Sequence, residues 1–468
     1  MQTSISKPKS IVYFIGFTAA LAGLLFGLDI GVISGALEFI QKDFSVSDRV
    51  LEFIVSALLW GAVFGTLISG VLSNQLGRKK TMLVSAVIFI VGSLYCSISG
   101  SANELIFARF LLGIAVGVAS FTAPLYLSEI SPQRVRGSMI SMYQLMITIG
   151  IMMAYFSNMY FGTTAIIHDQ VGGHWRVMLG VIAFPAILMF LGMLVLPESP
   201  RWLFLKGFQQ HGIDVFRKML LPEEDIASEV AEIERNLQQK QNGFRLLLTN
   251  SHFRRAILLG ISLQFIQQLS GINVVMYYAP RIFKIAGFAS TSGQMWGTVI
   301  IGITNMLATF IAIAFVDKLG RKPMMYAGFV VMGLSMITVG MFLNMNLEES
   351  PVFGYYAITA LLLFIIGFAM SAGPIIWIIC SEIFPLGGRD LGITFSTSAN
   401  WISNAIIGGT FLTMLSKLGN GNTFLFYGSI QALFIIFFML FVPETKGISL
   451  EHIESNLLSG KALRKIGK

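Results

Sequence analysis

Charge is the property that this sequence most clearly lacks. Asp, Glu, Lys and Arg together make up 12% of its 468 residues, whereas a soluble domain carries about 25%. So little charge cannot cover the water-facing surface of a chain of this length, of which 55% is hydrophobic. The composition excludes a soluble globular protein and indicates a protein embedded in a lipid bilayer.

Residues that bind metals or build nucleophilic sites are scarce as well. The two cysteines, Cys96 and Cys380, lie in apolar stretches, which is typical of small core residues rather than of a disulfide or a metal site. A membrane enzyme would need a nucleophile–base pair or a metal cluster, and the few histidines lie in loops or flanking segments. They are His168, His174, His211, His252 and His452. We therefore expect no enzymatic activity, no metal and no cofactor.

The basic residues need another explanation than nucleic acid. The formal net charge is +8, but no basic cluster alternates with aromatic residues that would stack on bases. We therefore expect no nucleic-acid partner and assign the Lys and Arg residues to the flanks of membrane spans. The apolar run from Ile11 is too long for the core of a cleaved signal peptide and predicts a first membrane helix.

Twelve apolar stretches are long enough to cross a membrane, which takes about 20 residues at 1.5 Å each. They lie near 11–37, 53–73, 81–99, 105–127, 138–161 and 175–196, and near 255–280, 295–316, 324–343, 354–380, 391–415 and 423–442. The sequence thus predicts an all-α membrane protein with two pseudo-symmetric six-helix halves, 1–196 and 254–443. A polar linker with short surface helices, 197–253, joins the halves, and a tail, 444–468, follows them; within the linker, 222–241 has amphipathic helical spacing.

Three short motifs occur twice, at nearly the same offset of about half the chain. They are Leu-Gly-Arg-Lys at 76–79 and 319–322, Ser-Glu-Ile at 128–130 and 381–383, and Pro-Glu at 197–198 and 443–444. Similar motifs in the same order indicate duplication of a half-length unit. Membrane proteins made of two similar halves are often transporters that hold their substrate between the halves.

Lys and Arg residues in the short loops predict the orientation in the membrane. They concentrate in the even-numbered loops, at Arg78, Lys79, Lys80, Arg134, Arg136, Lys318, Arg321, Lys322 and Arg389. We therefore expect a multi-pass protein with the even-numbered loops, the linker and both termini on the cytoplasmic side.

Two charges fall inside predicted spans, where each is costly and therefore a functional candidate. Asp29 lies about 27 Å along the first helix from Ile11, and Arg109 lies about 7.5 Å into the fourth span. Because the two spans run in opposite directions, both charges reach a similar depth and we expect them to pair. Either they form a static ion pair, or movement of Arg109 lets Asp29 load and release a proton; spacing leaves both open.

Uncharged polar side chains gather in the spans of the second half. Their amides need partners because lipid offers none, and the stretch Ser371–Pro374 should break the tenth span. The residues are Gln267, Gln268, Asn273, Tyr277, Asn305, Trp377, Asn400 and Trp401, with Gln144 in the first half. Interhelical bonding explains any single amide, but amides with aromatic rings, as a set, suit an uncharged polyhydroxylated ligand.

Over almost the whole chain, the sequence resembles the sugar porter family of the major facilitator superfamily. The motifs that carry the resemblance are 76–79, 197–202, Gln267-Gln268 with Gly271 and Asn273, 316–322 and 443–447. The run 138–146 looks most like the bacterial sugar–proton symporters of this family, those for galactose first and those for arabinose next. The resemblance implies a twelve-helix facilitator fold in the bacterial cytoplasmic (inner) membrane. It also implies import of a galactose- or glucose-type hexose by alternating access, with a proton as coupling ion and without an obligate protein partner, as a monomer.

The resemblance further implies roles for individual residues. Asp29 would be the proton-coupling carboxylate and Arg109 its partner; facilitative relatives usually carry Asn at the position of Asp29, which favours symport. Sugar contacts would come from Gln144, Gln267, Gln268, Asn273, Asn305, Trp377 and Asn400, with Tyr277 and Trp401 lining the site. A cytoplasmic charge network that locks the outward-facing state would comprise Arg78, Glu129 and Arg136, and Arg321, Glu382 and Arg389.

One position departs from the family pattern. The first loop motif usually carries an acid before Gly-Arg, where this chain has Asn74 and Gln75, whereas Asp317 keeps the acid in the second copy. We therefore predict a weaker inner gate in the first half, which biases the resting state inward. Two alternative functions remain open: an uncoupled sugar uniporter, and a transporter-like membrane sugar sensor, for which the tail after Gly447 is short.

Overall fold

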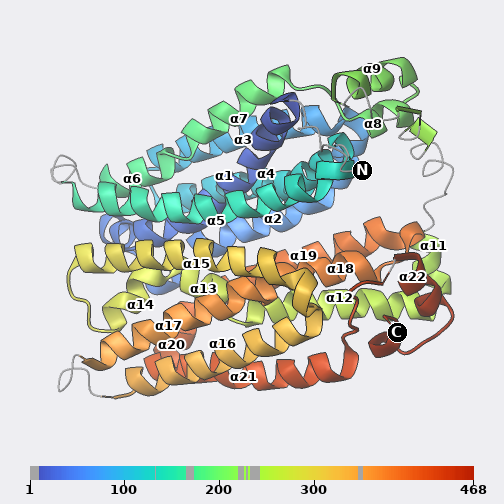
Figure 1. Ribbon diagram of the computed structural model, residues 1–468. Coiled ribbons are helices and arrows are strands. Elements are labelled where there is room, and N and C mark those ends of the chain that lie inside the picture. Colours follow the sequence, from blue (N-terminus) through green and yellow to red (C-terminus); the bar gives the residue numbers. More distant parts are fainter. Residues whose placement is uncertain are drawn as a thin grey trace, which may run out of the picture.

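The first half of the chain forms a bundle of membrane-length helices (Figure 1). The computed structural model describes residues 10–131, 133–164, 173–219, 226–227, 230–231, 243–345, 352–448 and 450–467. The helices of the first half are α1 (Ser10–Phe44), α2 (Asp48–Leu76), α3 (Arg78–Ile98), α4 (Ala102–Ile130), α5 (Gln133–Thr163), α6 (Gly173–Gly180) and α7 (Ala183–Val195).

The second half forms a similar bundle beside the first, coloured yellow-green to red in Figure 1. Its helices are α12 (Ser251–Leu269), α13 (Ile272–Tyr277), α14 (Ala279–Ile285), α15 (Thr291–Leu319), α16 (Arg321–Leu343), α17 (Val352–Met370), α18 (Ala372–Ile383), the 3-10 turn η2 (Leu386–Gly388), α19 (Arg389–Gly408), α20 (Phe411–Leu418) and α21 (Asn420–Phe441). The predicted all-α membrane architecture is confirmed.

Short helices mark one end of the molecule. They are α8 (Pro200–Leu205), α9 (Gln209–Met219) and α11 (Gly243–Thr249) from the linker, and α22 (Leu450–Leu458) with the turn η3 (Leu463–Lys465) from the tail. All lie at the end where both chain termini are found (Figure 1), which we call the linker end; the α1–α2 connection lies at the other, the far end. Most of the helix predicted over 222–241 lies outside the described residues.

Within the described residues, eleven helical segments are long and apolar enough to cross a membrane. The predicted span 391–415 falls on α19 and α20 and is not among the eleven, because serines, threonines and asparagines lower the hydropathy of α19. This polar helix nevertheless packs between α12 of its own half and α2 of the other. Its low hydropathy comes from a polar face that is buried against protein, while Ile402 and Ile406 lie on its exposed side.

The helix ends differ from the predicted boundaries where polar residues find partners. The first span was predicted to end at 37, but α1 continues to Phe44. Its last turns carry Glu38, which pairs with Lys284, and Gln41, which donates to Asp48. Because these polar groups are satisfied by protein, the helix extends beyond its apolar stretch.

Two spans of the second half are interrupted. The tenth span breaks at Ser371, between α17 and α18, as predicted. The seventh breaks at Gly271, whose φ of +91° favours glycine. Across this second break, Asn273 Nδ2 donates to Gln268 Oε1 at 2.6 Å. Both interruptions place polar groups inside the second half, where a substrate site needs them.

Small residues bring α2 and α4 into close contact. A Cβ atom added at Gly61 would lie 2.1 Å from the carbonyl oxygen of Phe110, and one added at Gly113 would lie 2.0 Å from that of Leu58. Only glycine permits this backbone approach, which is typical of helix pairs in membranes. The tight pairing fixes the part of α4 from which Arg109 projects.

Candidate substrate and proton site

A buried ion pair joins α1 to α4. Arg109 Nη1 donates to Asp29 Oδ1 at 2.7 Å, and each residue is 1% exposed. Arg109 Nε also donates to the carbonyl oxygen of Ile54 in α2, at 3.3 Å. The structure therefore brings together the two charges that the sequence predicts to be partners, and Arg109 connects three helices of the first half.

One oxygen of this pair has no hydrogen-bond donor. Asp29 Oδ2 is buried and accepts no hydrogen bond from any described residue. A buried charged oxygen without a partner is costly, and a carboxylate can lower that cost by binding a proton, which removes its charge. Asp29 Oδ2 is therefore an oxygen on which this buried pair could hold a proton.

An uncharged amide network lies where α12, α18 and α19 meet. Asn400 Nδ2 donates to Oε1 of both Gln264 and Gln267, at 2.7 Å each. Gln267 Nε2 in turn donates to the carbonyl oxygens of Ala372 at 2.8 Å and Gly373 at 3.0 Å, directly after the break in the tenth span. The three amide side chains are buried. Their hydrogen bonds fix the orientation of each amide, which a site needs if it is to bind hydroxyl groups in one geometry.

Aromatic residues extend this network toward the first half. The Tyr277 hydroxyl accepts a hydrogen bond from Asn404 Nδ2 at 3.2 Å. The Trp401 ring contacts that of Phe26 in α1, with centroids 5.2 Å apart. Phe26 lies three residues before Asp29, one turn away on the same helix. Trp401 therefore links the helix of the amide network to the helix of the ion pair.

The other predicted sugar contacts lie on neighbouring helices. Gln144 is partly exposed on α5 and Asn305 is buried on α15, two helices that pack against each other across the halves. Trp377 lies on α18 and is 38% exposed. The structure does not connect these three to the amide network by a described hydrogen bond.

Two members of the network escaped the sequence prediction. Gln264 is 0% exposed and lies three residues before Gln267, and Asn404 is 2% exposed and lies four residues after Asn400. Spacings of three and four place side chains on one face of a helix. A search for polar residues three or four positions from each predicted amide would therefore have identified Gln264 and Asn404.

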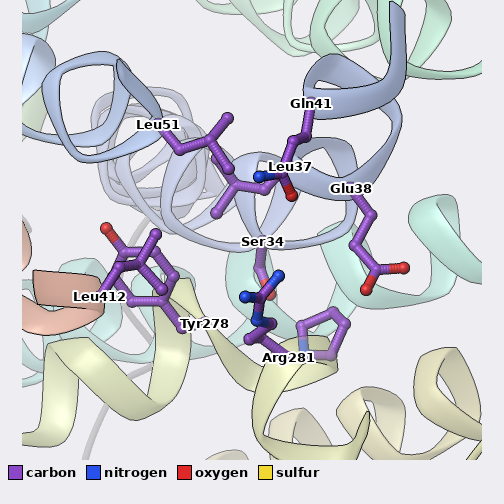
Figure 2. A pocket seen from close by; sticks show the side chains of 9 residues that line it. Ser34, Leu37, Glu38, Gln41, Leu51, Tyr278, Arg281 and Leu412 are labelled. Carbon is purple, nitrogen blue, oxygen red and sulfur yellow. The ribbon is translucent and has the colours of Figure 1, made fainter. Parts of the chain in front are cut away.

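The interface between the two halves, which we call the seam, is closed at the far end. The cavity between α1, α2, α14 and α20 measures about 20 Å³, room for about one water molecule, and Figure 2 shows its lining. A separate, more open groove of about 620 Å³ lies at the same end between α2, α4 and α19. Ion pairs join Lys284 Nζ to Glu38 at 3.0 Å and Arg281 Nη2 to Asp48 at 3.2 Å across the halves. Between α1, α2, α14 and α20, the described residues leave no passage for a sugar-sized molecule.

A charge cluster at the linker end ties together the first copies of the three repeated motifs. Arg78 Nε and Nη2 donate to the two carboxylate oxygens of Glu129 at 2.7 and 2.8 Å, and Ser199 Oγ donates to Glu129 Oε2 at 2.5 Å. Glu198 Oε1 accepts from the backbone N–H groups of Arg78 and Lys79, at 2.9 and 3.0 Å. Burial raises the pKa of the Glu198 carboxyl, although these backbone donors oppose the shift.

The second copies repeat this arrangement. Arg321 Nη2 donates to Glu382 Oε1 at 2.8 Å, and Thr445 Oγ1 donates to Glu382 Oε2 at 2.5 Å. Glu444 accepts from the backbone N–H groups of Arg321 at 3.0 Å and Lys322 at 2.8 Å. Each Pro-Glu motif therefore supplies an anion at the N-terminus of the helix that its Leu-Gly-Arg-Lys motif begins.

The remaining residues of the predicted cytoplasmic charge network are placed only in part. Arg389 begins α19 and is partly exposed. The side chains of Arg136 and of Asp317 lie outside the described residues. Trp202 Nε1 donates to the backbone carbonyl of Asn74 at 2.9 Å, so a linker helix packs where the family motif usually carries an acid.

Comparison with known proteins identifies the family. The model of the family described as sugar (and other) transporters matches residues 15–457. The chain belongs to this sugar transporter family. The transporter is 54% identical to the galactose-proton symporter of Escherichia coli over 98% of its own length and 97% of that protein. It is 46% identical to the arabinose-proton symporter of the same species, over 99% and 97%.

Solved structures agree on the fold of the major facilitator superfamily. One match is the xylose transporter XylE from E. coli in a partially occluded inward open conformation, with a TM-score of 0.82 and 31% identity. The match covers 94% of the present chain and 100% of the XylE chain. XylE bound to 6-bromo-6-deoxy-D-glucose matches over 98% and 99%, with a TM-score of 0.79 and 31% identity. The predicted facilitator fold of two six-helix halves is therefore confirmed.

Proposed function

We propose that this transporter imports a hexose of the galactose or glucose type together with a proton, by alternating access. The observation that carries the proposal is the buried Asp29–Arg109 pair, in which Asp29 Oδ2 lacks a donor. The similarity of the chain to two bacterial proton symporters supports the same function. The proton is then the coupling ion.

The sugar binds mainly to the second half. Gln267, Gln268, Asn273 and Asn400, with the more distant Gln144, Asn305 and Trp377, present donors, acceptors and an aromatic face to hydroxyl groups and C–H faces. Tyr277 and Trp401 line this site. Because the amides carry no charge, they suit an uncharged sugar better than an ionised substrate.

Protonation and rocking of the halves form one cycle. Asp29 takes up a proton on the outer side and releases Arg109, the sugar binds, and the halves rock so that both leave on the inner side. The membrane potential supplies about 2.3 kcal/mol per elementary charge per 100 mV. Arg78, Glu129 and Arg136, with Arg321, Glu382 and Arg389, form the inner gate that holds the outward-facing state.

The orientation follows from the basic loops. We place the linker end on the cytoplasmic side of a bacterial inner membrane, with both termini inside, and the far end outside. We keep the division into 1–196, 197–253, 254–443 and 444–468 as functional units, with the transporter working as a monomer. The state with a closed far end is then an inward-facing one.

The experiment that tests coupling is sugar-induced proton movement. Galactose added to a lightly buffered suspension of cells that express the transporter should alkalinise the medium, and an uncoupler should abolish the signal. Sugar uptake without alkalinisation would defeat symport in favour of the uncoupled uniporter. Competition of other sugars against labelled galactose would then rank the substrates.

A further inference from the structure

A buried carboxylate that belongs neither to the ion pair nor to the charge clusters lies at the far end of the seam. Glu52 in α2 is 0% exposed. Its Oε1 accepts a hydrogen bond from the backbone N–H of Thr413, and its Oε2 accepts one from Thr413 Oγ1, each at 2.7 Å. Thr413 belongs to α20 in the second half, so both bonds cross the seam.

Arg49 completes this contact. Its Nη1 donates to Glu52 Oε2 at 2.8 Å and to the carbonyl oxygen of Gly409 at 3.1 Å, where α19 passes into α20. Its guanidinium also lies over the Phe53 ring, 4.8 Å from the centroid. The charge of Glu52 is therefore balanced within α2, and the pair holds the α19–α20 corner by three hydrogen bonds.

We propose that Arg49, Glu52, Gly409 and Thr413 form an outer latch, in which Glu52 is a positioning residue that sets the balance between the inward- and outward-facing states. Opening of the far end must separate α2 from the α19–α20 corner, which breaks the three bonds that cross the seam. The Arg49–Glu52 pair stays intact because both residues belong to α2. Stronger latch contacts therefore favour the inward-facing state.

The latch acts on two helices that are bonded to the rest of the site. The Ile54 carbonyl of α2 accepts a hydrogen bond from Arg109, two residues after Glu52. Asn400 and Asn404 project from α19, whose end the latch holds. A change at the latch is therefore transmitted to the ion pair and to the amide network through rigid helices.

Burial distinguishes the carboxylate of Glu52, which is 0% exposed although its partner Arg49 is 53% exposed, from the carboxylates of the ion pairs that cross the seam. In those pairs, Asp48 and Glu38 are 38% and 16% exposed, and Arg281 and Lys284 are 34% and 52% exposed. Exposed pairs are screened by water and contribute little, whereas charge-assisted bonds to a buried carboxylate are strong. Lys284→Gln is therefore a matched control at the same end of the seam.

Cysteine labelling measures opening of the far end without sugar or protons. Ser56 lies one turn after Glu52 and is 6% exposed, and a Cβ added at Gly409 would lie 3.1 Å from Ser56 Cβ. Ser56 borders the groove between α2, α4 and α19, but so little of it is exposed that Ser56→Cys should react slowly while the latch is closed. A membrane-impermeant maleimide is supplied to intact cells, and labelling of the chain without Ser56→Cys, in which Cys96 and Cys380 are buried, is subtracted.

The latch predicts a graded response. Glu52→Gln should raise the labelling rate of Ser56→Cys about tenfold, and Thr413→Val, which removes one donor and leaves the charge, about threefold. Lys284→Gln should change it less than twofold. Because more of the population then faces outward, the apparent KM for external galactose in exchange should fall in the same order.

If neither Glu52→Gln nor Thr413→Val changes the labelling rate of Ser56→Cys, in protein that still exchanges galactose, the latch proposal is wrong. Where Glu52→Gln lowers expression, unchanged labelling with Thr413→Val alone overturns it. The latch proposal rests on the proposed function only because that function names the two states inward-facing and outward-facing. Altered labelling without sugar-induced proton movement would contradict symport and leave the latch standing.

Discussion

The two halves bury their polar groups in different ways. In the first half, Asp29 and Arg109 form an ion pair in which one carboxylate oxygen has no donor. In the second half, Gln267 is satisfied at both ends of its amide, by Asn400 and by backbone carbonyls, and no charge takes part. One half therefore holds a buried ion pair with one unsatisfied oxygen, and the other holds a neutral network of amides.

Under the proposed function, this difference follows from what each half binds. A proton binds to an oxygen that lacks a donor, so an incompletely satisfied carboxylate is useful despite its cost. A sugar binds by many directional hydrogen bonds, so its site needs amides that are held in place before the sugar arrives. The gates at the linker end, by contrast, are alike in both halves, as their repeated motifs require.

The largest effect should follow from breaking the ion pair on one side only. Arg109→Met leaves Asp29 buried without a cation, which should lower the stability by about 3–5 kcal/mol. Thermal unfolding of the purified protein measures this loss. The double variant Asp29→Asn with Arg109→Met should recover most of it, and a double variant as unstable as Arg109→Met would contradict a charge-based explanation.

Substitution in the amide network should affect affinity rather than coupling. Gln267→Ala removes a donor and an acceptor and should weaken galactose binding about tenfold, the equivalent of about 1.4 kcal/mol. Trp377→Ala should weaken it to a similar extent, and both variants should still concentrate sugar. Gln294→Ala is a matched control, since Gln294 is a buried amide outside the site.

Equal loss of affinity in Gln294→Ala would show that removal of any buried amide has this effect. Loss of uphill accumulation in Gln267→Ala, with affinity unchanged, would remove the contrast between the halves. Binding is measured by displacement of labelled galactose from purified protein.

The sequence predicted the elements that depend on hydropathy and on motifs. The Asp29–Arg109 pairing followed from depth along two antiparallel helices, and the break at Ser371 followed from Gly and Pro. The repeated motifs correctly indicated two similar halves. These features are local or periodic, so a single sequence records them.

Contacts between distant segments were beyond the sequence. The reason why Pro-Glu repeats together with Leu-Gly-Arg-Lys appears only when Glu198 and Glu444 are seen to accept from the first backbone N–H groups of α3 and α16. Glu52 sits near the end of an apolar span and looks like a surface acid until Thr413 is placed beside it. Such pairings depend on how the two halves dock.

The smallest effect should come from the one imperfect copy of the gate. Asn74→Asp restores the acid that the family motif usually carries and should raise outward occupancy a few-fold, because the inner gate of the first half is strengthened. Accessibility of Ser56→Cys from outside measures the occupancy. The same occupancy with Asn74→Asp would defeat the prediction of a weaker first gate.

Uphill accumulation and sugar exchange, measured in the same vesicles with Asp29→Asn, test the division of labour between the halves most directly. The variant keeps the shape of the side chain and loses the group that binds a proton. We predict that it no longer concentrates galactose when a proton gradient is imposed, while exchange of labelled for unlabelled galactose stays close to that of the unmodified transporter. If Asp29→Asn still concentrates galactose, the proton role of the first half is wrong.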